Sequence, residues 1–214
     1  MRFRIPSRIR RRLPFSSRRY WNERYLYGGN SGLGSYGRLA KYKAAFINDF
    51  AARRGITEAV EFGSGDGNQC ALFDFQRYTG IDVSRHAVVK CHKMFSDREG
   101  WQFYHVSDRA SRNVSAPLAL SLDVIYHLIE DYTFERYMRR LFDGSTHYVL
   151  IYSSDWNKMS GAKHIRHRKY TDWISRNRAD FVLEGEWAHP FPMTPNSDPK
   201  ETSFAHFKLF ARSA

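Results

Sequence analysis

Short apolar runs alternate along this chain with segments whose apolar residues recur at helical spacing. Seven runs predict strands, at 58–63, 78–83, 101–106, 118–124, 147–152, 181–187 and 203–211. Helical periodicity predicts helices over 38–52, 85–95, 134–142 and 171–178, and a further helix starting near Gly67. Strands that alternate with helices are typical of a parallel sheet with helices on both faces.

The last two predicted strands should pair differently from the others. The connection between them contains Pro190, Pro192, Pro195 and Pro199 and is too short for a crossover helix, so these strands should be antiparallel. The sequence therefore predicts an α/β fold. Its sheet has seven strands and is mostly parallel and Rossmann-like, with an antiparallel C-terminal hairpin and helices on both faces.

A glycine-rich turn follows the first predicted strand, in the sequence Glu61-Phe62-Gly63-Ser64-Gly65-Asp66-Gly67. Glycine has no Cβ and tolerates the backbone angles of tight turns, so backbone amides can approach a nucleotide-like ligand closely. The spacing departs from the dinucleotide pattern G-x-G-x-x-G, because the third glycine comes one residue early. The second predicted strand ends in Asp82, at the position where nucleotide-binding sheets carry a carboxylate for the ribose.

These two features resemble the cofactor site of class I S-adenosylmethionine-dependent methyltransferases. The resemblance implies that S-adenosyl-L-methionine is the cofactor and that Asp82 binds both ribose hydroxyls. The other residues it implies at the cofactor are Trp21, Arg24, Glu61, Gly63, Ser64, Gly65, Asp66, Gly67, Ser107, Asp108 and Asp123. The stretches 28–50, 61–69, 120–142 and 148–168 are also similar to small bacterial methyltransferases associated with surface polysaccharides.

Two of these assignments have structural alternatives. Asp82 could be the N-cap of the helix at 85–95, although Ser84 suits that role better. Trp21 could anchor a packed helix while Arg24 lies on the surface. Five glycines between Gly28 and Gly37 predict a mobile flap, so segment 20–52 is expected to form a lid.

The fourth predicted strand ends in the pattern Asp123-Val124-Ile125-Tyr126-His127. It lacks the prolines of amino-group methyltransferases and resembles O-methyltransferases of small molecules, lipids and sugars. A hydroxyl becomes a good nucleophile when its proton is removed, and a neutral imidazole can accept that proton. His127 is the first candidate base, and the alternative is a histidine packed under the following helix.

The loop after the fifth strand is rich in cations between Lys158 and Lys169. We expect it to face the acceptor, with Arg166 and Arg168 binding an anionic group and with His164 and His167 as alternative bases. Tyr126 and Asp155 are the other expected acceptor contacts. The alternative is an ordinary solvated loop, and no metal site is predicted because no carboxylate pattern accompanies the histidines.

The net charge of +12 is concentrated at the N-terminus. Residues 1–19 contain eight arginines and no acidic residue, so the rest of the chain carries only +4. We therefore expect a flexible basic tail at 1–19 and one domain at 20–214. The tail could contact an anionic inner-membrane surface or RNA.

The sequence contains no apolar run long enough to span a membrane and only two cysteines, which indicates a cytoplasmic protein with reduced thiols. The function expected first is O-methylation of an anionic sugar, such as a bacterial surface glycan. The alternatives are an RNA methyltransferase that uses the tail and a catalytically silent cofactor-binding scaffold. The sequence makes no prediction of oligomeric state.

Overall fold

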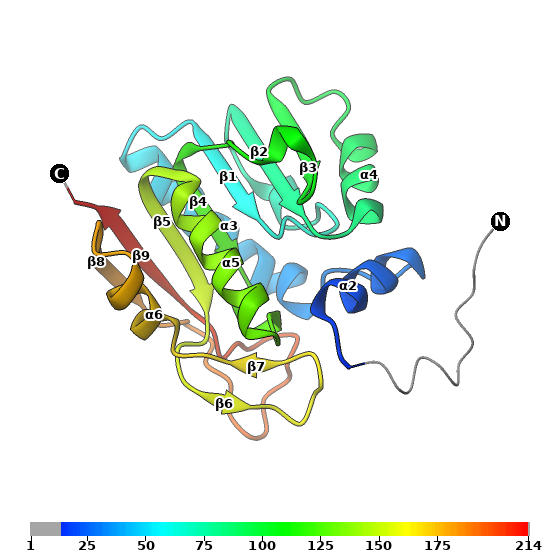
Figure 1. Ribbon diagram of the computed structural model, residues 1–214, viewed down its shortest axis with the longest axis vertical. Coiled ribbons are helices and arrows are strands. Elements are labelled where there is room, and N and C mark those ends of the chain that lie inside the picture. The colour runs from blue at the N-terminus through cyan, green and yellow to red at the C-terminus, as the bar shows by residue number, and fades with distance from the viewer. Residues whose placement is uncertain (1–13, 214) are drawn as a thin grey trace.

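The structure, a computed structural model, describes residues 14–213 and contains a seven-stranded sheet (Figure 1). Its strands lie side by side in the order β3 (Trp101–His105), β2 (Arg77–Asp82), β1 (Glu58–Phe62), β4 (Ala116–Leu122), β5 (Ser145–Ser153), β9 (His206–Arg212) and β8 (Phe181–Trp187). The first five are parallel, and β9 pairs antiparallel with both β5 and β8. The predicted α/β sheet with its antiparallel C-terminal hairpin is confirmed.

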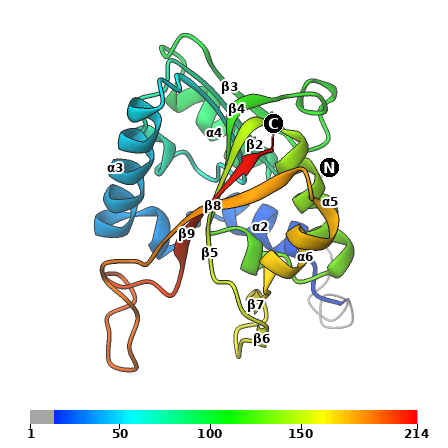
Figure 2. The same cartoon turned by 90° about the vertical axis from the view of Figure 1, so that its left-hand side faces the viewer.

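Helices cover both faces of the sheet, as Figure 2 shows for α3 on one side and for α5 and α6 on the other. The helices are α2 (Ser17–Leu26), α3 (Gly37–Arg53), α4 (Arg85–Met94), α5 (Asp131–Asp143) and α6 (Tyr170–Asn177). Among residues 14–213, no helix is both long and apolar enough to cross a membrane.

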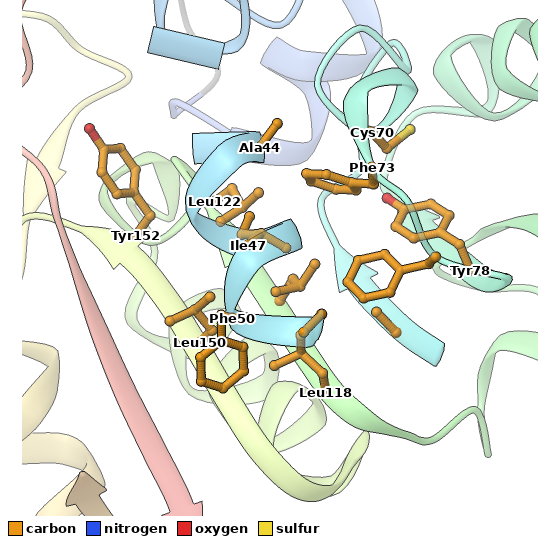
Figure 3. Close-up of a cluster of buried hydrophobic side chains, with 14 of the residues drawn as sticks. Ala44, Ile47, Phe50, Cys70, Phe73, Tyr78, Leu118, Leu122, Leu150 and Tyr152 are labelled. Atoms are coloured by element: carbon orange, nitrogen blue, oxygen red, sulfur yellow. The ribbon is translucent and has the colours of Figure 1, made fainter. Parts of the chain in front are cut away.

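Alternate residues of the central strands pack on opposite faces. Leu118, Leu120 and Leu122 of β4 belong to the core under α3, whereas Ala119 belongs to the core under α5 and α6. Figure 3 shows Ile47 of α3 packed over this first face. Burying a side chain of this size contributes about 1.5–3 kcal/mol. This two-sided burial explains why the strands appear in the sequence as nearly continuous apolar runs.

The structure corrects three details of the predicted elements. No α-helix begins near Gly67, where only a short 3₁₀ turn forms (Cys70–Leu72). The cation-rich loop contains a two-stranded hairpin of β6 (Lys158–Met159) and β7 (Arg166–His167).

The third correction concerns the basic tail. Helix α2 begins at Ser17, so residues 17–19 are part of the folded domain, while the predicted flexibility of residues 1–13 lies outside the described residues. Ser16 caps the helix by accepting a hydrogen bond from the Arg19 amide. Glu130 accepts hydrogen bonds from both the amide and the hydroxyl of Ser17, which fixes the start of α2 against the loop before α5.

The carboxyl ends of the parallel strands meet at one edge of the sheet, where α2 and the β6–β7 hairpin also lie (Figure 1). Strand β1 has β2 on one side and β4 on the other, so the strand order reverses there. Ligands of open α/β sheets bind at such a reversal. The fold therefore brings the ends of β1, β2 and β4 together around one candidate site.

Candidate active site

The turn after β1 passes close to its neighbours because it contains glycine. Gly63 and Gly65 have φ angles of +91° and +59°, which other residues rarely adopt. A Cβ at Gly65 would collide with the Ser31 hydroxyl, and one at Gly63 would collide with Val124. Both positions therefore require glycine, on conformational and on steric grounds.

Asp82 lies buried at the end of β2, opposite this turn. Its Oδ2 accepts a hydrogen bond from the Gly65 amide at 2.9 Å, and its Oδ1 accepts one from the Ser84 amide at 2.7 Å. Burial raises the pKa of Asp82 to about 6 in spite of these bonds. Helix α4 is capped by Ser84, which accepts a hydrogen bond from the Ala87 amide, so Asp82 is not its N-cap.

Two further acidic residues, Glu61 and Asp123, lie at the ends of β1 and β4. Glu61 is buried and accepts a hydrogen bond from the Tyr78 hydroxyl, and burial raises its pKa to about 7. Asp123 has a φ of +59°, an uncommon backbone conformation that is often found at functional sites. Its Oδ2 lies 2.5 Å from Nζ of the fully buried Lys43, and its Oδ1 accepts a hydrogen bond from the Tyr126 hydroxyl at 2.8 Å. Tyr126 thus holds Asp123 in place, and it does not line the cavity that lies over these strand ends.

A cavity of about 400 Å³, here called the central cavity, lies over these strand ends. Nine of the residues expected at the site line it: Trp21, Glu61, Gly63, Ser64, Gly65, Asp82, Ser107, Asp123 and His127. They come from α2 and from the ends of β1, β2, β3 and β4. The structure therefore places at one cavity most of the residues that the sequence assigned to a cofactor.

Two other expected cofactor residues hold the cover loop, residues 27–36, instead of lining the cavity. Asp66 accepts hydrogen bonds from the Ser31 hydroxyl at 2.7 Å and from the Tyr36 hydroxyl at 2.5 Å. Burial opposes ionisation of Asp66, but these bonds lower its pKa below the ordinary value. Arg24 donates from Nε to the Asn30 carbonyl oxygen at 2.5 Å. Both residues therefore stabilise the loop that covers the glycine turn.

Gly67 and Asp108 also lie outside the lining of the central cavity. A Cβ at Gly67 would press on Phe95, so this glycine allows α4 to pack closely against the turn. Asp108 accepts a hydrogen bond from the His105 amide and lies 3.2 Å from the Arg85 guanidinium.

His127 is half-buried on the cavity wall, and its ring makes an edge-on contact with the ring of Trp21. Its Nδ1 lies 2.8 Å from the His164 carbonyl oxygen. Because a carbonyl can only accept, Nδ1 must carry the proton, and Nε2 of the neutral ring is free to take another. Burial lowers the pKa of His127 to about 4, which keeps the ring neutral at physiological pH but makes it a weaker base than a free imidazole.

The other two candidate bases do not line the central cavity. His164 stacks between the rings of Tyr20 and His127. His167 stacks on Trp156, and its Nδ1 lies 2.7 Å from the Ser154 hydroxyl.

The expected anion-binding cations of the loop are paired within the protein. Arg166 and Arg168 both contact Asp131, at 3.0 and 2.6 Å, and Arg168 also donates to the carbonyls of residues 128 and 129. Asp155 lies 2.9 Å from Nζ of Lys208 and accepts hydrogen bonds from Thr171. These three expected acceptor contacts lie outside the cavity and hold the loop and α6 in place.

Several further residues, for which the sequence predicted no role at the site, line the central cavity, among them Arg18, Tyr25, Gln69 and Arg136. Arg18 and Arg136 have no ion pair or hydrogen-bond partner within residues 14–213. Arg18, Trp21 and Tyr25 are spaced three and four residues apart on α2, and this spacing could have indicated a shared face. Among the described residues, no group of three or more His, Cys, Asp or Glu is placed to hold a metal ion.

The architecture is similar to that of several solved methyltransferases. The N-methyltransferase NodS from Bradyrhizobium japonicum WM9, in complex with S-adenosyl-L-homocysteine, is 10% identical; the match covers 93% of this chain and 100% of that one, with a TM-score of 0.68. The magnesium protoporphyrin IX methyltransferase from Synechocystis PCC 6803 with bound cofactor is 13% identical, over 94% and 99% of the two chains, with a TM-score of 0.63. The small RNA methyltransferase HEN1 is 15% identical, over 84% of this chain and 26% of that one, with a TM-score of 0.61.

The fold is that of class I S-adenosylmethionine-dependent methyltransferases. At these identities the likeness concerns the fold alone. No protein-family model matches the chain, and no curated protein matches it in sequence.

Proposed function

We propose that this protein is an S-adenosylmethionine-dependent methyltransferase that methylates a hydroxyl group of an anionic acceptor. The observation that carries the proposal is the meeting of the glycine turn, Asp82 and His127 at one cavity. The first two suit a nucleoside ligand, and the third is a neutral imidazole with one nitrogen free.

The central cavity fits S-adenosylmethionine in the chemistry of its wall. Asp82 uses one lone pair of each oxygen on backbone amides, so each oxygen can still accept from a ribose hydroxyl. Gln69 Oε1 is buried without a hydrogen-bond partner among residues 14–213 and lies on the cavity wall, where it could accept from an ammonium group. Glu61 and Asp123, which line the same cavity, would supply negative charge there.

The cofactor, when bound, supplies a methyl group on a positively charged sulfur. The residues of the chain would align an acceptor with it and exclude water, which is the main requirement of an in-line transfer. His127 Nε2 would take the hydroxyl proton, while the His164 carbonyl keeps the ring in the required tautomer. The cover loop would shield the reacting groups.

Arg18 and Arg136 line the central cavity and support an anionic acceptor. They take the role expected of Arg166 and Arg168, which are paired with Asp131. The resemblance in sequence favours an acidic sugar or a bacterial surface glycan. RNA is the second candidate acceptor, because it is a polyanion and its ribose also carries sugar hydroxyls. It is favoured by a basic cleft beside the cavity and by the likeness to a small RNA methyltransferase. Contact of the basic N-terminus with a membrane, in a cytoplasmic protein, stays a prediction.

The test is methyl transfer from isotopically labelled S-adenosylmethionine to separated glycan, RNA, lipid and protein pools of a cell extract. We expect label in the glycan or RNA pool, in a linkage with the alkali stability of an ether. Label in no pool, as a silent scaffold would give, or label on amines only, would contradict the proposal.

A further inference from the structure

A second hollow lies beside the central cavity, between α2 and the start of α4. This hollow, here called the arginine cleft, has a volume of about 460 Å³. It is lined by Ser16, Arg18, Arg19, Asn22, Val83, Arg85, His86 and His105. Of the described residues, three arginines and no acidic residue line it, so an anion is the ligand its charge favours.

The arginines keep donors available for such a ligand. Arg18 has no hydrogen-bond or ion-pair partner among residues 14–213, and Arg19 donates from one nitrogen to the Pro14 carbonyl. Arg85 lies 3.2 Å from Asp108, but its side chain is 64% exposed. Exposed ion pairs contribute little, so this one can be exchanged for a contact with phosphate.

His105 closes the floor of the cleft without adding charge. Its Nδ1 accepts a hydrogen bond from the Ser107 amide at 3.2 Å, so Nε2 carries the proton and donates to the Val83 carbonyl at 3.1 Å. Burial lowers its pKa, which favours the neutral ring. The positive charge of the cleft therefore comes from the arginines.

Helix α2 separates the arginine cleft from the central cavity. Trp21 and Tyr25 face the cavity, Arg19 and Asn22 face the cleft, and Arg18 lines both. A small anion would occupy one hollow only. A linear polyanion crossing the start of α2 would contact both at once.

An exposed aromatic ring lies at the rim of the central cavity as well. Tyr132 of α5 lines the cavity and is 74% exposed. Sites for single-stranded nucleic acid combine a basic groove for the backbone with aromatic rings on which bases stack. The arginine cleft and Tyr132 together meet this description.

We propose that the arginine cleft binds a backbone phosphate of a single-stranded RNA acceptor while a ribose of the same strand reaches His127. The proposal rests on the proposed methyltransferase function and narrows its acceptor. Guanidinium groups suit this task because their planar array of donors matches phosphate oxygens.

The experiment measures binding of a fluorescent single-stranded RNA of about 16 nucleotides to the full chain by anisotropy, over a range of salt concentrations. The test variant is Arg19→Ala/Arg85→Ala, whose residues line only the cleft. The control is Lys41→Ala/Arg176→Ala, which removes equal charge from exposed positions that line neither hollow. We expect the test variant to bind at least about tenfold more weakly, with the slope of log affinity against log salt smaller by about 0.7, the value for one phosphate contact on a single strand. The control should stay within about twofold of the wild type, because phosphates that it does not contact release no counterions.

Equal losses in the two variants, or no RNA binding by the wild type, would overturn the proposal. So would a carboxylate polysaccharide or phosphatidylglycerol vesicles that bind as tightly as RNA and lose affinity equally in the test variant. Calorimetry with S-adenosylhomocysteine on the same proteins separates the two claims. If the wild type binds S-adenosylhomocysteine but not RNA, only the proposed role of the arginine cleft is overturned. If the wild type does not bind S-adenosylhomocysteine, the proposed methyltransferase function is overturned as well.

Discussion

The glycine turn with Asp82 and the loop at 153–169 lie at the same edge of the sheet, yet they use their charges differently. At the turn, Asp82 and Glu61 line the central cavity. In the loop, Arg166, Arg168 and Asp155 form ion pairs with other parts of the protein.

The difference shows what position at a strand end can and cannot indicate. A residue directly after a parallel strand is fixed at the ligand edge by the sheet itself. A charged residue within a long loop can turn back and pair with any opposite charge in reach. The strand ends therefore line the central cavity, and the loop charges form ion pairs outside it.

Replacing His127 should give the largest effect, because it is the one of the three histidines considered as bases that lines the central cavity. His127→Ala should lower turnover by about 10²–10⁴-fold while the affinity for S-adenosylhomocysteine stays nearly unchanged. His164→Ala is the matched control, since it keeps the backbone carbonyl that orients His127. It should lower turnover by less than about tenfold. Equal losses of turnover in the two variants would contradict the assignment of His127 as the base.

Replacing Lys43 tests whether the ion pair between Lys43 and Asp123 stabilises the fold. Lys43→Met leaves Asp123 without its buried partner, which should lower the free energy of unfolding by about 3–5 kcal/mol. For a chain of this size the melting temperature should fall by about 6–20 °C. Lys41→Met on the exposed side of the same helix is the control and should melt within about 2 °C of the wild type. A Lys43→Met/Asp123→Asn variant should recover part of the loss, and a single variant that melts like the wild type would contradict the pairing.

A change of pH should have a smaller effect, on the affinity for the ligand, through Glu61 and Asp82 beside the glycine turn. Burial raises the pKa of Glu61 to about 7 and that of Asp82 to about 6, and in the proposed site the ionised forms would accept hydrogen bonds from the ligand. Lowering the pH protonates both residues in the free protein, so S-adenosylhomocysteine should bind at least about tenfold more weakly at about pH 5 than at about pH 8. Glu61→Gln should flatten the upper part of this curve. An affinity independent of pH would contradict the contact with these carboxylates.

Much of the fold follows from the sequence because its central strands are buried on both faces. The apolar runs of these strands, such as the run around Leu150, can be recognised in the local sequence, without knowing which distant residues pack against them. The start of α2 could not be placed in this way. Its partner Glu130 lies 113 residues further along the chain, and Ser17 carries no local sign of that contact.

The residues of the candidate site likewise fall into those that the local sequence indicates and those that depend on distant partners. Gly65 and Asp82 are set by the turn and the strand end, and both can be recognised locally. Arg168 depends on Asp131, a partner 37 residues away, and a count of cations cannot show that pairing. The arginines around Arg18 in the sequence predict that it belongs to a tail, whereas helix α2 places it at the central cavity.

Calorimetric titration of S-adenosylhomocysteine into the wild type and into Asp82→Ala tests most directly whether the glycine turn and Asp82 hold the cofactor. We predict saturable binding by the wild type and an affinity about 10²–10⁴-fold lower in Asp82→Ala, since two hydrogen bonds to a charged group are lost. No binding by the wild type, or the same affinity in both proteins, would contradict the assignment of this cavity.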